Sequence, residues 1–399
     1  MEDRKEKAIN LILVGLGLKY FPSIILGMLI QAKTVIPSTL PAIVSLAILG
    51  LFVAGYVLFV KGSLLFTRSK GYSQYWGWIG LFSIFGLSIL LFIPSRQKVY
   101  LENRNSVRDL FAGINIPELL LFLSIALPTI FYSTIWAVSF LIERSFSDLT
   151  RDKVIIGIAG IVLIPVFVFI LLKQISTANL SLDKIVGSKN SINFKLILSI
   201  VALEIPFNYG FSSLTLYNLS FVFPDYVERH LNSRHLSNIL EIILYGISSV
   251  LLAPVVEELF CRGVVLQKWV SKWGVRAGII TSSLLFAIIH FRYDVISLFI
   301  GGAIFSILYF KTCNLITPIL CHCFYNSIIL IFNIIDFLGK SPVQRNALVT
   351  VNDYQNFMEP ILGQRVLLLA VSAPLLGYFI FKNFPRNDAT LPYLANDGL

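Results

Sequence analysis

Three short groups of polar residues lie inside apolar stretches of the chain, and their side chains suit hydrolytic chemistry. The groups are Glu257-Glu258 with Arg262, Phe286 with His290, and His322 with Asn326. An ionisable residue in a membrane segment is costly, so its presence there favours a functional role. Carboxylates, imidazoles, a guanidinium and an amide together supply a base, an acid and hydrogen-bond donors. The pattern predicts a hydrolytic site rather than a lipid-facing surface.

The two adjacent acids are expected to differ. Glu258 and Arg262 are four residues apart, so on a helix they share a face and can form an ion pair. Glu257 points about 100° away on a helix and has no partner in its own motif. A purely structural ion pair remains an equally good interpretation of Glu258 and Arg262, but a weaker one of Glu257. Pro254 predicts that an apolar helix breaks here and runs into a polar turn.

The interpretation of the two histidines depends on the residues near them in the sequence. His290 ends an apolar run, where a single histidine is more often an ordinary core residue. His322 and Asn326 are four apart on one predicted helical face and can present two donors to one developing oxyanion. They can equally form a packing hydrogen bond between helices. Because the chain has only four histidines, two beside such partners favour a shared site.

The elements that hold these residues are predicted from composition. The 399 residues are 56% hydrophobic and 14% charged, with a mean hydropathy of +0.79, whereas soluble proteins have roughly 25% charged residues. Apolar runs of helix length are expected at residues 8–30, 42–60, 76–93, 119–141, 154–172, 196–217, 239–256, 277–291, 295–310, 316–335 and 366–381. We therefore predict an all-α, polytopic transmembrane helix bundle of about 10–12 membrane helices, with the active site in a cavity at membrane depth.

Three regions follow from the distribution of polar residues. Residues 1–195 form an N-terminal transmembrane region without a polar constellation, residues 196–381 form the domain that carries the three motifs, and residues 382–399 form a polar tail. The net charge of +10 comes from lysines and arginines between the apolar runs, such as Arg68, Lys70, Lys184 and Lys195. Basic loops beside lipid headgroups explain this charge, so membrane lipids are expected partners and nucleic acid is not.

The three motifs, in this order and spacing, closely resemble those of the CPBP intramembrane protease family. This family contains the type II CAAX prenyl endopeptidases and abortive-infection-like proteins. The resemblance covers residues 245–335, and it includes Gly301-Gly302 and Tyr309 between the second and third motifs. It implies an intramembrane endopeptidase, in which Glu258 and Arg262 maintain the architecture of the site.

The resemblance also implies roles for the remaining motif residues. Glu257 would be the general base, and His290 would help to position the attacking water. His322 and Asn326 would form the oxyanion hole. We expect Glu257, Glu258, His290, His322 and Asn326 to converge on one cavity.

The motifs also bear on the cofactor and the substrate of the predicted site. Glu257, His290 and His322 could bind zinc and leave one position open for water, but the chain has no HExxH motif, and a metal-free site is favoured. Cys321 and Cys323 diverge from His322 on a helix, so this run is not expected to form a metal site. The substrate is expected to be a peptide or lipidated protein, with CAAX-type processing as the family's example.

A non-catalytic membrane protein is the alternative interpretation. A transporter, immunity factor or scaffold can use buried acids and histidines, for example in proton relays. Against a transporter, the chain has no repeated half with paired broken helices, and all motif acids are intact. The expected location is a multi-pass position in a bacterial plasma membrane or an equivalent organellar membrane.

Overall fold

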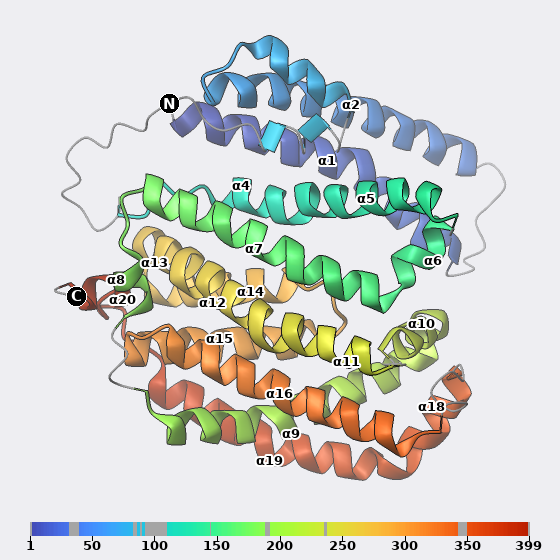
Figure 1. Cartoon of the computed structure of the whole chain (residues 1–399), viewed down its shortest axis with the longest axis vertical. Helices are drawn as coiled ribbons and strands as arrows, with labels where there is room; N and C mark the ends of the chain where they lie inside the picture. The colour runs from blue at the N-terminus through green and yellow to red at the C-terminus, as the bar shows by residue number, and fades with distance from the viewer. Residues whose placement is uncertain are drawn as a thin grey trace. The chain divides into compact units, whose positions relative to one another are not determined.

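A computed structural model gives the fold of the chain (Figure 1). It describes residues 2–31, 40–82, 86–87, 90–91, 110–143, 145–187, 192–234, 238–341 and 349–397. Across these ranges every regular element is a helix and no strand occurs. The predicted all-α fold is confirmed.

Eight helical stretches in the described ranges are long and apolar enough to cross a membrane, and a shorter apolar helix covers Val275–Ile289. The eight are Gly50–Ser69, Ile116–Leu141, Lys153–Thr177, Phe194–Val222, Ile239–Trp273, Val295–Thr312, Ile316–Gly339 and Val351–Asn383. Helices of this kind satisfy all their backbone hydrogen bonds internally, as a lipid environment requires. The protein is therefore an integral, multi-pass membrane protein.

Eight of the eleven predicted apolar runs correspond to these stretches of the described residues, and the other three are located as follows. The apolar run at 76–93 forms a 3-10 helix over Gln74–Phe82, and residues 83–85, 88–89 and 92–93 lie outside the described set. The run at 277–291 forms the short helix α14 (Val275–Ile289). The run at 8–30 lies in α1 (Glu2–Gln31), which is helical throughout.

The chain divides into two compact units: unit 1 is Met1–Glu102 with Asn115–Thr150, and unit 2 is Asn103–Ile114 with Arg151–Leu399. Helix α7 (Lys153–Thr177) precedes residue 195 but belongs to unit 2. The functional division at residue 195 stays a prediction.

In unit 1, α1 packs closely against α2 (Leu40–Ser69). Small residues allow this approach, because a Cβ atom added to Gly15 would lie 2.6 Å from the backbone nitrogen of Phe59. A Cβ atom on Gly55 would likewise lie 2.6 Å from the carbonyl oxygen of Gly15. Glycine contacts of this type bring membrane helices close enough for extensive van der Waals packing.

A buried charge cluster also belongs to unit 1, although no polar constellation was predicted there. Glu118 lies in the first turn of α4 (Ile116–Leu121) and forms ion pairs with Lys5 and with Lys70, the latter at 3.3 Å. The prediction that Lys70 faces lipid headgroups is wrong, because its side chain is only 4% exposed. Its ammonium group also donates to the carbonyl oxygens of Leu90 and Leu91.

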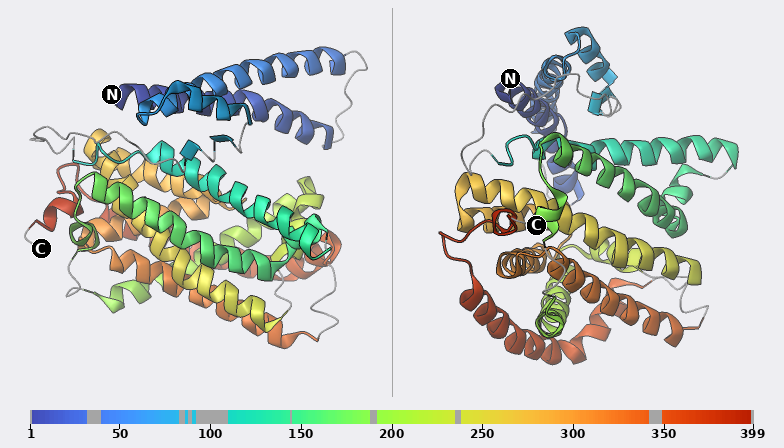
Figure 2. Two further views of the ribbon diagram at one scale, coloured as in Figure 1. Left: turned by 45° about the horizontal axis from the view of Figure 1, so that its top comes forward. Right: turned by 60° about the vertical axis from the view of Figure 1, so that its left-hand side comes forward.

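Unit 2 has its core where helices α9 (Phe194–Val222), α15 (Val295–Thr312), α16 (Ile316–Gly339) and α19 (Leu362–Asn383) meet. Figures 1 and 2 show α9, α16 and α19 running side by side. Every buried member of this core cluster comes from one of these four helices. Three of these helices, α9, α15 and α16, also contribute residues to a polar cavity, together with α14 and the stretch that carries the first motif.

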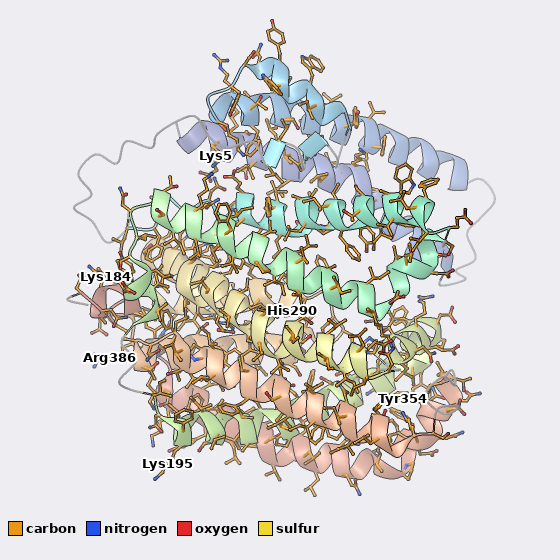
Figure 3. The ribbon with its side chains drawn as sticks, viewed as in Figure 1. Lys5, Lys184, Lys195, His290, Tyr354 and Arg386 are labelled. Atoms are coloured by element: carbon orange, nitrogen blue, oxygen red, sulfur yellow. The ribbon has the colours of Figure 1, made fainter. Side chains whose placement is uncertain are left out.

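Several basic residues of unit 2 lie near helix ends. Lys184, Lys195 and Arg386 lie at one end of the helices in Figure 3, whereas Tyr354 lies at the other. Lys184 forms an ion pair of 2.5 Å with Asp397, so the polar C-terminal tail is attached to this end. Charges at helix ends leave the long apolar segments free for lipid contact.

Candidate active site

The first motif lies within a continuous helical stretch, Ile239–Trp273. The predicted helix break and polar turn at this motif are therefore wrong. Pro254 is in the first turn of α12 (Ala253–Glu258) and is preceded by a π-helical segment, Gly246–Leu252. A widened turn accommodates the proline ring and its missing N–H, so the chain stays helical where lipid would penalise unpaired backbone groups.

The predicted ion pair between Glu258 and Arg262 is present and fully buried. Their atoms Oε1 and Nη1 are 2.9 Å apart, and the side chains are 0% and 1% exposed. The second terminal nitrogen of Arg262 donates to the carbonyl oxygen of Gly302 at 3.1 Å. The Nδ1 atom of His322 lies 3.0 Å from the same Glu258 oxygen. Glu258 thus orients both a guanidinium and an imidazole, which sequence spacing did not predict.

Phe286 connects the first and second motifs. Its ring centroid lies 4.4 Å from the guanidinium carbon of Arg262, a distance typical of a cation–π contact. Its carbonyl oxygen lies 2.6 Å from Nδ1 of His290, which follows the last turn of α14 (Figure 3). A carbonyl oxygen only accepts, so Nδ1 of His290 must be the donor, and Nε2 of a neutral ring then carries a lone pair.

Glu257 finds its partners on other helices. Its Oε2 atom lies 3.5 Å from Nε2 of His290 and 3.9 Å from Nε2 of His322. The Glu257 side chain is 27% exposed, in contrast to the buried Glu258. Oε2 of Glu257 has no direct hydrogen-bond partner among the described residues. Oε2 of Glu258 also lacks a partner in this set, but Glu258 is fully buried with Arg262 and His322 on Oε1, whereas Glu257 is partly exposed at the cavity.

Asn326 lies one helical turn after His322 on α16. Its Nδ2 atom donates to the carbonyl oxygen of Ser249 at 2.7 Å. An amide group has two N–H donors, so one remains available after this bond. The bond to Ser249 fixes the direction of the amide beside the π-helical segment.

One cavity of about 260 Å³ in unit 2 brings most of the predicted residues together. Its wall includes Glu257, His290, His322 and Asn326. The expectation that Glu258 also lines the cavity is wrong, because its carboxylate lies behind the wall against Arg262 and His322. Arg262 is likewise absent from the wall.

The cavity also contains polar residues that the sequence interpretation did not single out. Glu204 and Asn208 come from α9, Tyr325 lies beside Asn326, and Arg292 and Asp294 follow α14. Glu204 was detectable in principle, because it is an acid within the apolar run 196–217. Asn208 follows it by four residues on the same helix, the spacing that singled out His322 and Asn326. The convergence of this pair with the three motifs is a tertiary feature.

The residues proposed as zinc ligands do not have the arrangement that a metal requires. Across the described ranges, no group of three or more His, Cys, Asp or Glu side chains is placed to hold a metal ion. Nδ1 of each cavity histidine is directed to a protein oxygen, the Phe286 carbonyl for His290 and the Glu258 carboxylate for His322, which leaves both Nε2 atoms toward Glu257. Histidines that bind a metal through Nε2 commonly have such partners at Nδ1, so these bonds by themselves do not argue against a metal. We derive no step through a metal.

Comparisons with known proteins bear on the stretch that carries all three motifs. Residues 239–328 match the family model described as type II CAAX prenyl endopeptidase Rce1-like. No curated protein and no solved structure matches the chain. The matched stretch begins six residues before the predicted motif core and contains all three motifs. Residues 239–328 are therefore similar to type II CAAX prenyl endopeptidases, a kind of protease, and the resemblance to the CPBP family is confirmed over this stretch.

Proposed function

We propose that the protein is an intramembrane endopeptidase that hydrolyses a peptide bond with a water activated by Glu257 and His290. The observation that carries this proposal is the 3.5 Å approach of Glu257 Oε2 to His290 Nε2 at the cavity wall. Both atoms are acceptors when the imidazole is neutral, because its Nδ1 proton is committed to Phe286. One water can donate a hydrogen to each acceptor at ordinary hydrogen-bond distances.

The first chemical step follows from this arrangement. Because Glu257 and His290 accept the two hydrogens of the water, a lone pair on its oxygen is directed into the cavity, toward the carbonyl carbon of a bound peptide. Glu257 accepts one proton as the water oxygen bonds to that carbon. A tetrahedral intermediate forms, and the former carbonyl oxygen becomes an oxyanion.

His322 and Asn326 supply donors for that oxyanion. Asn326 has one N–H left after its bond to Ser249. His322 directs Nδ1 to the Glu258 carboxylate, so donation from Nε2 requires a ring that carries both protons. Oriented donors at such a site stabilise the charge that develops in the transition state.

Collapse of the intermediate completes the reaction. The carbon–nitrogen bond breaks, and the proton held by Glu257 passes to the leaving amine. The products are a peptide with a new carboxyl end and a peptide with a new amino end. Glu258 and Arg262 touch neither reacting atom in this scheme, and they act as positioning residues for His322.

Substrate class rests on the family match. The similarity of residues 239–328 to CAAX prenyl endopeptidases supports a lipidated peptide near its carboxyl end. We propose a metal-free reaction in a bacterial plasma membrane or an equivalent organellar membrane. Membrane lipids and the lipidated substrate are the proposed partners, and nucleic acid is not.

The test uses the full-length protein in proteoliposomes with farnesylated peptides that end in a CAAX sequence. Mass spectrometry of both products should show cleavage after the farnesylated cysteine, and the Glu257→Gln variant should lack it. Lack of cleavage by the intact protein, with movement of a solute across the membrane instead, would favour the transporter alternative. That alternative draws on the same polar cavity.

A further inference from the structure

The cavity wall contains a second group of acceptors that the proposed reaction does not use. Glu204 is 2% exposed, and neither of its carboxyl oxygens has a hydrogen-bond partner among the described residues. The side-chain oxygens of Asn208 and Ser297 also lack partners within that set. All three residues line the cavity. Buried polar groups are normally hydrogen-bonded, so a cluster of unsatisfied oxygens around one cavity indicates that an occupant supplies the donors.

The charges around the cavity indicate the sign of the charge on that occupant. Three carboxylates line the wall, and the only guanidinium there among the described residues is that of Arg292. Arg292 is committed to Asp294, with contacts of 2.9 and 2.6 Å. Glu257 faces two imidazoles. Glu204 alone has neither a cation nor an imidazole within ion-pair distance.

Nearby cations do not satisfy Glu204 from behind the wall. Arg262 is close enough to interact with it electrostatically, but its terminal nitrogens bond to Glu258 and to the Gly302 carbonyl. On the neighbouring helix α15, Gly301 leaves room beside Glu204, because a Cβ atom there would lie 3.7 Å from Oε1. The carboxyl group thus faces a glycine surface and the cavity rather than a partner side chain.

We propose that Glu204 and Asn208 form a subsite for a cationic side chain of the substrate, a lysine or an arginine. This inference rests on the proposed peptidase function and names a property of its substrate. An ammonium or guanidinium group would supply both the missing charge and several N–H donors to the two residues. An isolated carboxylate in a low-dielectric site is costly, and a hydrogen-bonded cation offsets that cost.

The test measures binding separately from cleavage. Full-length protein with Glu257→Gln, which retains the cavity but lacks the base, is titrated in proteoliposomes with fluorescent farnesylated peptides. Each peptide carries lysine at one of the three positions after the cysteine, or norleucine at the same position. We expect the lysine peptide to bind at least about 10-fold more tightly at one of these positions, because a desolvated charge pair is strongly coupled.

Glu204→Gln in the same background should reduce the preference for lysine to near unity, and Asn208→Leu should reduce it in part. Glu359→Gln removes an exposed carboxylate outside the cavity and should leave the preference unchanged. Melting temperatures identify a variant that has lost its fold. Glu204→Gln and Asn208→Leu test the lysine preference independently of each other. An equal loss for both peptides would assign Glu204 a structural role.

Several outcomes overturn the subsite. These are equal affinity for lysine and norleucine at all three positions, tighter binding of norleucine, or no binding of either peptide. They leave the peptidase proposal to its own test, in which the protein without the Glu257 substitution cleaves a neutral CAAX peptide. Cleavage without a lysine preference would refute only the cation subsite, whereas lysine-selective binding without cleavage would refute only the peptidase.

Discussion

Unit 1 and unit 2 each contain a buried acid in an apolar helix, and the two acids have opposite surroundings. Glu118 in unit 1 is 13% exposed and ion-paired to Lys5 and Lys70. The Asn115 side chain also accepts from its backbone N–H, which caps α4. Glu204 in unit 2 is 2% exposed, and its oxygens lack hydrogen-bond partners in the described part of the chain. An acid whose carboxyl oxygens are paired with protein groups maintains structure. An acid at a cavity whose oxygens have no protein partner is available to a ligand.

The adjacent acids of the first motif differ in another way, because Oε2 of each lacks a hydrogen-bond partner in the described part of the chain but only one of the two side chains reaches the cavity. Glu258 has an arginine and a histidine on one oxygen and no cavity exposure. Glu257 has imidazoles at 3.5 and 3.9 Å and reaches the cavity. Replacing each acid by its amide isostere therefore distinguishes structural from functional acids, and the predictions below use that substitution.

The largest effect is expected where a fully buried pair is broken. Glu258→Gln leaves the Arg262 guanidinium without its counter-ion, which costs roughly 3–5 kcal/mol of folding free energy. Arg262→Ala should act in the same way by leaving Glu258 unpaired. Detergent-extracted yield and melting temperature measure the loss. Near wild-type melting temperatures for both variants would contradict a structural role for this pair.

Glu257→Gln should affect catalysis instead. The amide preserves the shape of the side chain but cannot accept the proton of water, so cleavage of the farnesylated peptide should fall at least ~100-fold. Yield and melting temperature should remain close to those of the wild type. The assignment of roles is wrong if this variant keeps most of its activity, or if it is less stable than Glu258→Gln and Arg262→Ala.

Glu118→Gln tests unit 1 with a smaller expected effect. Lys70 would lose an ionic partner but retain its two carbonyl acceptors, so we expect a loss of about 1–3 kcal/mol. The melting temperature should fall, while the cleavage rate per folded molecule stays the same. A selective loss of cleavage with normal stability would mean that unit 1 takes part in the reaction.

Extended chelation should have the smallest effect. The proposed reaction uses only protein groups and water, so removal of metal ions should not impair it. Treatment with 1,10-phenanthroline should leave peptide cleavage unchanged, and elemental analysis should find no stoichiometric zinc. Zinc that is bound by the wild type and lost in both His290→Ala and His322→Ala would replace the metal-free mechanism but retain the peptidase.

Local spacing predicted the contacts within single helices. Glu258 and Arg262 pair as their four-residue separation indicates, because helical geometry alone brings such side chains together. Spacing did not predict the contact of His322 with Glu258, since sixty-four residues separate them. The continuity of the helix through Pro254 was also missed, because the preceding π-helical segment has no recognisable sequence pattern here.

The amino-acid sequence by itself determined that the chain is helical and embedded in a membrane, because apolar helix-length runs have no other stable form in lipid. It also indicated candidate residues for a hydrolytic site. Only the tertiary structure decided which acid faces the cavity, that Glu258 lies behind its wall, and that Glu204 joins it from α9. These outcomes depend on how separate helices pack and rotate against one another, and residue spacing within one helix does not specify that.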